Sequence, residues 1–349
     1  IQPYFEDDFE AEIIEVSSKS LIVVGHDKGG FNSGELEDFL GETDIPVLAE
    51  DPLTTPGAIA HASLFLTDAE LRITLKPDEI IVIGRTTLSR SINSFINECE
   101  KVTVIDPRLE NVDVNRSASR KFTALPFLHV STGASDQDWK NLWSSLSQIE
   151  VPITRWSEQA AVLEIVNSLP EDSALFIGSS RPVRDIEACA HYRPKIHTYA
   201  NRGLAGIDGN ISTALGMAEG YERSYSILGD ITFMHDISAL VNSDKTINHC
   251  IFVIDNNGGG IFSTLPQAGA QGFEQVFGTP HNKDIESIVR AFDIEVVKVK
   301  NPSDIRMQIN KRGLRCVIVE VPSREENASF IKELHQIASR AARIGANLA

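Results

Sequence analysis

The feature that most constrains the fold is the alternation of short, β-branched, apolar runs with segments of helical periodicity. Such alternation predicts βαβ units and a parallel sheet, because parallel neighbours need a crossover helix between them. Two series of runs occur, and the stretch 127–153 between them contains turn residues and two tryptophans. The predicted strands are 21–25, 45–49, 79–84 and 101–106, and then 174–178, 195–200, 225–229, 250–255, 294–300 and 315–321.

Helical periodicity fills the spaces between these strands, at 33–39, 88–100, 183–191, 208–221, 235–243, 283–292 and 302–311. A last helix carries apolar residues at the spacing of a stripe that faces a core: Phe330, Leu334, Ile337 and Ala341. The expected fold class is α/β, with two tandem doubly wound parallel-sheet domains. We expect a linker at 1–18, a central Rossmann-like domain at 19–150 and a second domain at 151–349.

The composition argues against two classes of function. A formal net charge of −17 leaves no general basic surface for the phosphates of nucleic acid. No apolar run approaches the roughly 18–20 residues of a membrane span, and the acidic N-terminal stretch is unlike a signal sequence. The four cysteines show no metal-binding spacing, so we expect reduced, buried thiols in a cytoplasmic protein.

Polar, glycine-containing turns follow three of the predicted strands. Their sequences are GSSRPVRD at 178–185, GDIT at 229–232 and DNNGGGIF at 255–262. Ligands of open parallel sheets bind beyond the carboxyl ends of the strands, so these turns are candidate site segments. An acid such as Asp230 could alternatively be an ordinary helix cap, and one such turn alone would be weak support for a site.

The combination of donors in these turns indicates a metal site. Asp230 offers a carboxylate, Asn256 and Asn257 offer amide oxygens, and the glycines at 258–260 allow a backbone carbonyl to approach a ligand. Such hard oxygen donors suit Mg²⁺, which typically keeps positions for phosphate oxygens. Backbone amides at a helix N-terminus favour an anion. We therefore predict a diphosphate held through a divalent cation.

These motifs resemble those of a known family. Gly229-Asp230, followed some two dozen residues later by Asn256-Asn257, resembles the metal–diphosphate motif of thiamine-diphosphate enzymes. The stretches GDITFMHD, DNNGGGIFSTLPQ, SSRPVRD and NRGLAGIDG together resemble the MenD family of SEPHCHC synthases (2-succinyl-5-enolpyruvyl-6-hydroxy-3-cyclohexene-1-carboxylate synthases). The resemblance covers essentially the whole chain and makes 151–349 the diphosphate-binding domain.

The resemblance implies a set of cofactor-binding residues. Asp230, Asn256 and the carbonyl of Gly258 would bind Mg²⁺ or Mn²⁺. Anchoring on GGGIF selects Asn256, whereas counting from Asp230 selects Asn257. Thiamine diphosphate would also contact Gly229, Ile231, Thr232 and the apolar Ile207.

The resemblance also implies the substrates, 2-oxoglutarate and isochorismate. Both carry carboxylates, which guanidinium groups pair with and orient. The residues that match the substrate-binding positions of the family are Arg184, Arg202, Ser180, Arg90, Ile261, Phe262 and Leu265. Arg90 could instead be a solvated helix arginine, and we expect His235 to be structural rather than an acid–base group.

The implied reaction decarboxylates 2-oxoglutarate and adds the succinyl semialdehyde unit to isochorismate, with release of CO₂, in menaquinone (vitamin K2) biosynthesis. In the family, the glutamate that activates the cofactor lies in an N-terminal pyrimidine-binding domain. We expect this domain to be absent from this chain, which would then be a truncated form, inactive alone. The full-length protein is expected to be a homodimer or homotetramer.

Two other functions stay open at this point. A different thiamine-diphosphate enzyme, such as a 2-oxoacid decarboxylase, would share the metal motif but need not carry SSRPVRD or NRGLAGIDG. A non-catalytic module that binds a nucleotide or a metabolite is the second. The turn GHDKGGF at 25–31 lacks GxGxxG spacing, which argues against a dinucleotide.

Overall fold

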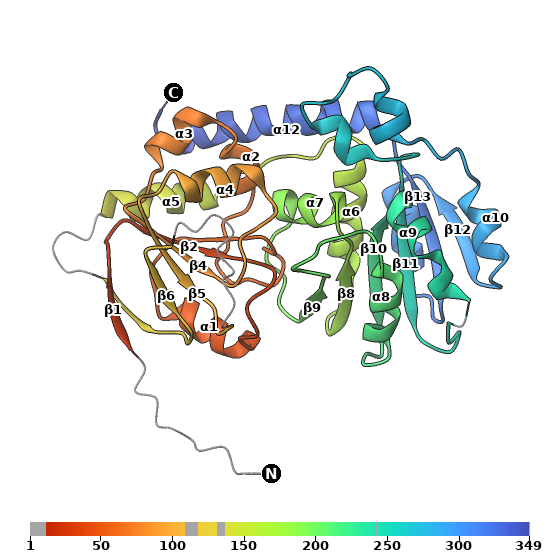
Figure 1. The fold of residues 1–349 in the computed structure, drawn as a ribbon, viewed down its shortest axis with the longest axis horizontal. Helices are drawn as coiled ribbons and strands as arrows, with labels where there is room; N and C mark the ends of the chain where they lie inside the picture. Colours follow the sequence, from red (N-terminus) through yellow and green to blue (C-terminus); the bar gives the residue numbers. More distant parts are fainter. Residues whose placement is uncertain (1–11, 109–117, 131–136, 242, 349) are drawn as a thin grey trace, which may run out of the picture.

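Three parallel β-sheets with flanking helices make up the computed structural model of the chain, which describes residues 12–108, 118–130, 137–241 and 243–348 (Figure 1). Every strand pair that the sheets contain is parallel. The predicted α/β fold with two tandem parallel-sheet units is therefore confirmed. The acidic stretch at the N-terminus, 1–11, lies outside the described residues.

The first unit contains a five-stranded sheet in the order β3-β2-β4-β5-β6. Its strands are β2 (Ser20–Val24), β3 (Val47–Ala49), β4 (Glu79–Ile83), β5 (Lys101–Ile105) and β6 (Arg120–Phe122). Beside it lies a two-stranded sheet of β1 (Ile13–Val16) and β7 (Phe127–Val130). The helices of this part are α1 (Ser33–Gly41), α2 (Ala62–Phe65), α3 (Ala69–Thr74), α4 (Arg90–Asn97) and α5 (Gln137–Ser147).

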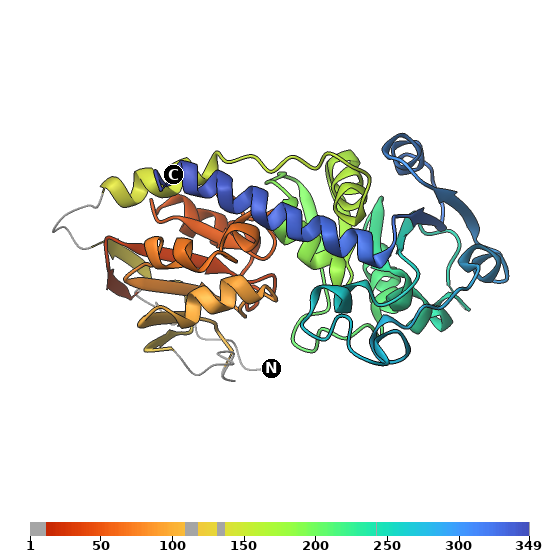
Figure 2. The same ribbon diagram turned by 90° about the horizontal axis from the view of Figure 1, so that it is seen from above.

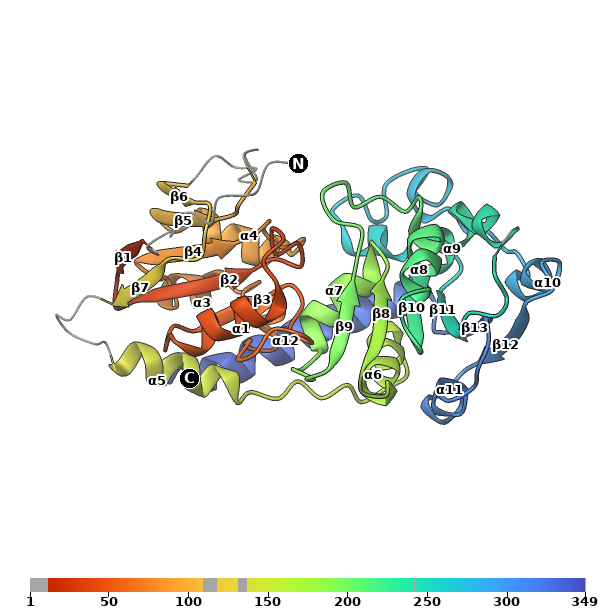
Figure 3. The ribbon, with the colours of Figure 1, turned by 90° about the horizontal axis from the view of Figure 1, so that it is seen from below.

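The second unit contains a six-stranded sheet in the order β12-β13-β11-β10-β8-β9 (Figure 3). Its strands are β8 (Ser173–Ile177), β9 (Ile196–Tyr199), β10 (Ser224–Gly229), β11 (His249–Asp255), β12 (Glu295–Val299) and β13 (Arg315–Glu320). The α-helices are α6 (Glu158–Ser168), α7 (Arg181–Cys189), α8 (Asn210–Ala218), α9 (Asp230–His235), α10 (Ile285–Arg290), α11 (Pro302–Ile309) and α12 (Arg324–Gly345). Three short helical turns complete it: η1 (Ile237–Leu240), η2 (Gly260–Thr264) and η3 (Glu274–Gly278).

The central strands of both sheets are buried on both faces, which explains their continuous apolar sequences. All five residues of β4 and of β8 are buried, and separate apolar clusters cover the two faces of each sheet. All four cysteines are free and buried, as predicted. None of the described helices is both long and apolar enough to cross a lipid bilayer.

Helix α12 connects the two units. It begins beside the six-stranded sheet and runs along the five-stranded unit next to α5 (Figure 2). Phe330 and Leu334 pack in one cluster with Trp143 of α5 and with strand residues such as Val82. The apolar stripe predicted for the last helix therefore faces a core, and that core includes the first sheet. The proposed domain boundaries, including the one near residue 151, stay predictions.

The main difference from the sequence prediction concerns the segment after β10. A helix was expected at 235–243, but α9 begins at Asp230, directly at the strand end, and only the short turn η1 follows it. Helices α2, α3, α5 and α6 and the short, partly exposed strands β1, β6 and β7 were not predicted. Strand β1 lies within the segment expected to be a linker.

Candidate functional site

The three polar turns singled out in the sequence lie side by side. They follow β8, β10 and β11, which are consecutive in the sheet, and Gly229 of β10 pairs in register with Ile254 of β11. The chain order reverses between β8 and β10, because β9 lies outside β8 while β11 lies on the other side of β10. Ligands of doubly wound sheets bind at such a switch point.

Asp230 is the first residue of α9 and is not its cap. The N-cap is Gly229, and no side chain caps this helix. The buried carboxylate of Asp230 accepts hydrogen bonds from the backbone N–H groups of Ile231 (2.6 Å) and Gly258 (2.8 Å). Asp230 thus joins the end of β10 to the turn after β11.

The two asparagines of the β11 turn point in different directions. The side-chain N–H of Asn256 donates to the carboxylate of Glu158, and its Oδ1 is buried with no partner among the described residues. Asn257 is exposed, has φ +63° and pairs with Asn282, to which it is hydrogen-bonded at 2.8 and 3.0 Å. Of these two asparagines, Asn256 is therefore the one that presents an unused buried oxygen, as a metal ligand would.

The glycines of this turn allow a close approach of two backbone segments. Gly258 has φ +142°, and a Cβ at this position would lie 2.3 Å from the carbonyl oxygen of Gly278. A Cβ on Gly259 would lie 2.4 Å from the carbonyl oxygen of Phe277. A residue with a side chain cannot occupy these positions without moving the backbone.

A cavity with about 660 Å³ of empty space, its open mouth included, lies between the turns. It is lined by most of the residues that were predicted to bind the cofactor and by several of the predicted substrate-binding residues. These are Ser180, Ile207, Gly229, Asp230, Ile231, Thr232, Asn256, Gly258, Ile261 and Phe262. Ser180 has φ +76°, a strained conformation for a residue with a side chain, and such strain is frequent at functional sites.

Buried charges of α6 and α7 form the inner wall of this cavity. Arg181 pairs with Glu158 (3.3 Å) and with Asp185. Burial raises the pKa of Glu158, and the nearby Arg181 opposes this shift. The sequence pattern did not indicate this cluster, since Glu158 lies on an unpredicted helix 98 residues before Asn256.

Arg90 and Arg184 line a second pocket, which also contains Leu265. Ile261 and Arg181 line both pockets, so the two are adjacent. Arg184 donates to the carbonyl of Ser180 (2.6 Å), and burial together with nearby Arg181 lowers the pKa of Arg184. The carboxylate of a bound ligand would pair with Arg184 and reduce its repulsion from Arg181.

The structure does not place Arg202 in either of these pockets. Its Nη2 donates to both carboxylate oxygens of the fully buried Glu50 of the first unit, at 2.8 and 3.0 Å, and Arg202 lines a separate pocket beside β9. His235 is exposed at the end of α9 and lines neither pocket.

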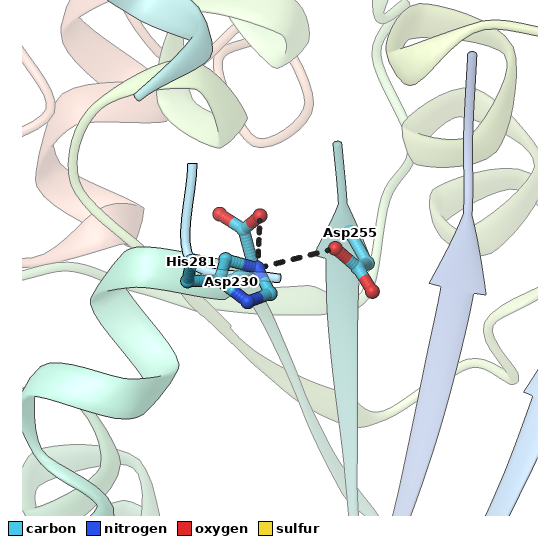
Figure 4. A group of neighbouring side chains, drawn as sticks. All are labelled: Asp230, Asp255 and His281. Atoms are coloured by element: carbon cyan, nitrogen blue, oxygen red, sulfur yellow. Dashed lines mark hydrogen bonds and ion pairs between the residues drawn. The ribbon is translucent and has the colours of Figure 1, made fainter. Parts of the chain in front are cut away.

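A further group at the site was not predicted. His281, on the loop after η3, lies between Asp230 and Asp255 (Figure 4). Its Nε2 is 3.2 Å from Oδ2 of Asp230 and 3.5 Å from Oδ1 of Asp255. The hydrogen bond to Asp230 raises the pKa of His281, while burial and the proximity of Asp230 raise the pKa of Asp255.

These residues fit a divalent cation that also binds an anionic ligand. The orphaned Oδ1 of Asn256, the carboxylate of Asp230 and the backbone of Gly258 are hard oxygen donors from two adjacent strand ends. Gly229, Ile231 and the polar Thr232, at the start of α9, line the same cavity. Phosphate oxygens suit such surroundings.

Comparison with known proteins agrees with this chemistry. Residues 185–321 match the C-terminal TPP-binding domain of thiamine pyrophosphate enzymes. A curated 2-succinyl-5-enolpyruvyl-6-hydroxy-3-cyclohexene-1-carboxylate synthase of Bacillus cytotoxicus is 33% identical over 348 residues, which cover 90% of this chain and 59% of that protein. The chain is a relative of these synthases.

Two further SEPHCHC synthases support this relationship. The protein of Saccharopolyspora erythraea is 33% identical over 282 residues, covering 74% of this chain and 49% of the relative. The protein of Staphylococcus haemolyticus is 31% identical over 329 residues, covering 89% and 58%. The resemblance stated from the motifs is thereby confirmed. The chain spans between half and three fifths of the length of these SEPHCHC synthases.

Proposed function

We propose that this chain provides the diphosphate-binding and part of the substrate-binding machinery of a SEPHCHC synthase in menaquinone biosynthesis. The observation that carries the proposal is the convergence of Asp230 and Asn256 on one cavity, with the Asn256 Oδ1 buried and unpartnered among the described residues. The names of the curated relatives support the reaction.

Asp230, Asn256 and the carbonyl of Gly258 would hold Mg²⁺ or Mn²⁺ together with the diphosphate of thiamine diphosphate. Gly229, Ile231 and Thr232 line the same space, and Ile207 offers apolar contact to the ring system. When bound, the cofactor supplies the nucleophilic carbon and the electron sink for decarboxylation of a 2-oxoacid. The protein contributes placement and electrostatic stabilisation.

The substrates would be 2-oxoglutarate and isochorismate, joined with loss of CO₂. Arg90 and Arg184 carry positive charge into one pocket, where they can orient carboxylates. Ile261, Phe262 and Leu265 supply an apolar wall that excludes water from the reacting groups, and Ser180 adds a polar group near the join of the two pockets. Arg202 would take part only if a substrate carboxylate replaced Glu50 as its partner.

We further infer a homodimer or homotetramer for the whole enzyme, on the resemblance to the family. The cytoplasmic location rests on cysteine usage and stays a prediction. The regulatory or nucleotide-binding alternative has no comparable support, since the cavity donors suit a metal-bound diphosphate.

Calorimetric titration tests the cofactor assignment. We expect thiamine diphosphate with Mg²⁺ to bind to the chain, and NAD to give no heat of binding. Asp230→Ala should abolish the response, because it removes the charged donor, whereas Asp44→Ala, in an exposed pair with Lys140, should leave it unchanged. Equal binding of thiamine diphosphate by Asp230→Ala would contradict the assignment.

A further inference from the structure

The loop after η3 is fastened to the turn that carries Asn256. The N–H of Gly259 donates to the carbonyl of Gly278 (2.8 Å), and the side chain of Asn257 both donates to and accepts from Asn282. These contacts join two segments about 20 residues apart into one unit. The loop therefore has a defined position relative to the end of β11.

The backbone of this loop is bent at both sides of His281. Thr279 has φ +39° and Asn282 has φ +49°, conformations that cost free energy for residues with a side chain. The contacts to Gly259 and Asn257 hold the loop in this shape. The result is that the imidazole of His281, only 8% exposed, is directed at the buried end of β10.

The hydrogen-bond pattern of the ring fixes the position of its hydrogen. The backbone N–H of Lys283 donates to Nδ1 of His281 at 3.0 Å, so Nδ1 acts as an acceptor. Nε2 then carries the hydrogen, and this hydrogen faces Oδ2 of Asp230 and Oδ1 of Asp255 (Figure 4). Nε2 could bind a metal ion only after losing this hydrogen, and Nδ1 could not take it up while it accepts from Lys283, which argues against His281 as a ligand.

We propose that His281 is a positioning residue of the divalent-cation site. Its Nε2–H, together with the N–H groups of Gly258 and Ile231, holds the Asp230 carboxylate in one orientation beside the cavity. Carboxylates that bind metals are commonly fixed by such outer hydrogen bonds. The inference rests on the proposed function, since it assigns His281 to the cation site of that function.

Electron paramagnetic resonance of free Mn²⁺ tests the proposal, with the whole 349-residue chain and thiamine diphosphate present. His281→Leu should raise the Kd for Mn²⁺ by about 10- to 100-fold, the usual effect of losing an outer partner of a metal ligand. His281→Gln keeps a side-chain donor and should restore most of the affinity. His129→Leu, at an exposed histidine of β7, is the matched control and should bind as the unaltered chain does.

The possible outcomes separate the two proposals. Mn²⁺ binding that is unaltered in His281→Leu would overturn the role of His281 and leave the proposed function standing. Equal weakening in His281→Leu and His281→Gln, with a lowered Tm in both, would show a structural role or a direct ligand and would also overturn it. Absence of Mn²⁺ binding to the unaltered chain would overturn both proposals.

Discussion

At the scale of single residues, the candidate site depends on which polar atoms the protein itself satisfies. Glu158 accepts a hydrogen bond from the side-chain N–H of Asn256, so the side-chain oxygen of Asn256 is the atom left for a ligand. Asn257 uses both its donor and its acceptor for Asn282. Adjacent residues of the same type thus have different roles, and the difference arises from partners distant in the sequence.

Gly258 gives a direct test of the turn geometry. Gly258→Ala should lower the free energy of unfolding by about 1–3 kcal/mol, because its φ of +142° is strained for alanine and the new Cβ would meet the Gly278 carbonyl. The measurement is urea-induced unfolding. Gly216→Ala, inside α8 with nothing within 4 Å of the new Cβ, is the control and should stabilise the protein by about 0.5–1 kcal/mol. Equal effects of the two substitutions would contradict the described turn.

The sequence allowed some of these residues to be predicted and not others. Asp230 and Asn256 follow apolar strands, and a parallel sheet brings its carboxyl ends to one edge. Glu158 and His281 carry no such signal, because tertiary packing brings an unpredicted helix and a loop to the site. The choice between Asn256 and Asn257 as the metal ligand stays a prediction, and the unpartnered buried oxygen favours Asn256.

At the scale of secondary-structure elements, the site owes its form to the absence of a loop between β10 and α9. The helix begins at the residue that follows the strand, so Asp230 lies both at the sheet edge and in the first helical turn. The predicted helix at 235–243 was placed too late because helical periodicity cannot locate a start that falls directly at a strand end. The strands that precede the three turns, by contrast, were predicted correctly, and their parallel arrangement already implied that the turns lie at one edge of the sheet.

Helix α12 is the element that connects the two units. Shortening a side chain on its buried face should therefore destabilise the protein. Leu334→Ala should lower the free energy of unfolding by about 2–5 kcal/mol, since Leu334 is fully buried in the cluster shared with the first sheet. Ile344→Ala, at a residue 67% exposed, should change it by less than about 0.5 kcal/mol. Denaturant unfolding of both variants is the test. If Leu334→Ala left the free energy of unfolding unchanged, α12 would not pack against the first unit as described.

The buried carboxylate of Glu79, the first residue of β4, predicts a pH dependence of stability. Although burial opposes its ionisation, hydrogen bonds from Lys101, Thr103 and Arg120 lower the pKa of Glu79. The ionised Glu79 therefore stabilises the folded state fully at pH values above the ordinary pKa of a glutamate. This stabilisation is lost as the pH falls through the lowered pKa of the folded state.

The variant Glu79→Gln should accordingly be less stable by about 1–3 kcal/mol at neutral pH, and the difference should shrink as the pH falls below the ordinary pKa of a glutamate. Thermal unfolding as a function of pH measures this. Glu171→Gln, in an exposed and solvent-screened pair with Lys195, should change the Tm much less than Glu79→Gln at neutral pH. A destabilisation by Glu79→Gln that grows on acidification would contradict the predicted direction of the pH dependence.

At the scale of the whole molecule, the pocket beside the cofactor cavity is shared by the two units. Arg90 begins the helix after β4, Arg184 lies on the helix after β8, and both line one pocket. A ligand bound in this pocket would contact both units at once. The fold class and the succession of the strands followed from the sequence, but this shared pocket did not, because nothing in a linear pattern fixes how two sheets face each other.

The proposed function predicts that Arg184 binds a substrate carboxylate. In an enzyme completed by the pyrimidine-binding domain that the family resemblance implies, Arg184→Ala should raise the KM for isochorismate by about 10- to 100-fold, the effect of losing a charge-assisted hydrogen bond. Steady-state turnover with 2-oxoglutarate and isochorismate is the measurement. Arg312→Ala, at an arginine paired with an exposed glutamate, is the control and should have no effect. If Arg184→Ala left the KM for isochorismate unchanged, the result would favour a different thiamine-diphosphate enzyme.

The proposed function depends on one cation site, at which the ends of β10 and β11 together hold a divalent ion that binds a diphosphate. A crystal of the chain grown with Mn²⁺ and thiamine diphosphate, with the ion located by its anomalous scattering, tests this site most directly. We predict a single Mn²⁺ at about 2.0–2.3 Å from side-chain oxygens of both Asp230 and Asn256 and from a diphosphate oxygen. An ion that contacts only one of these two side chains, or a diphosphate bound elsewhere on the molecule, would contradict the proposal.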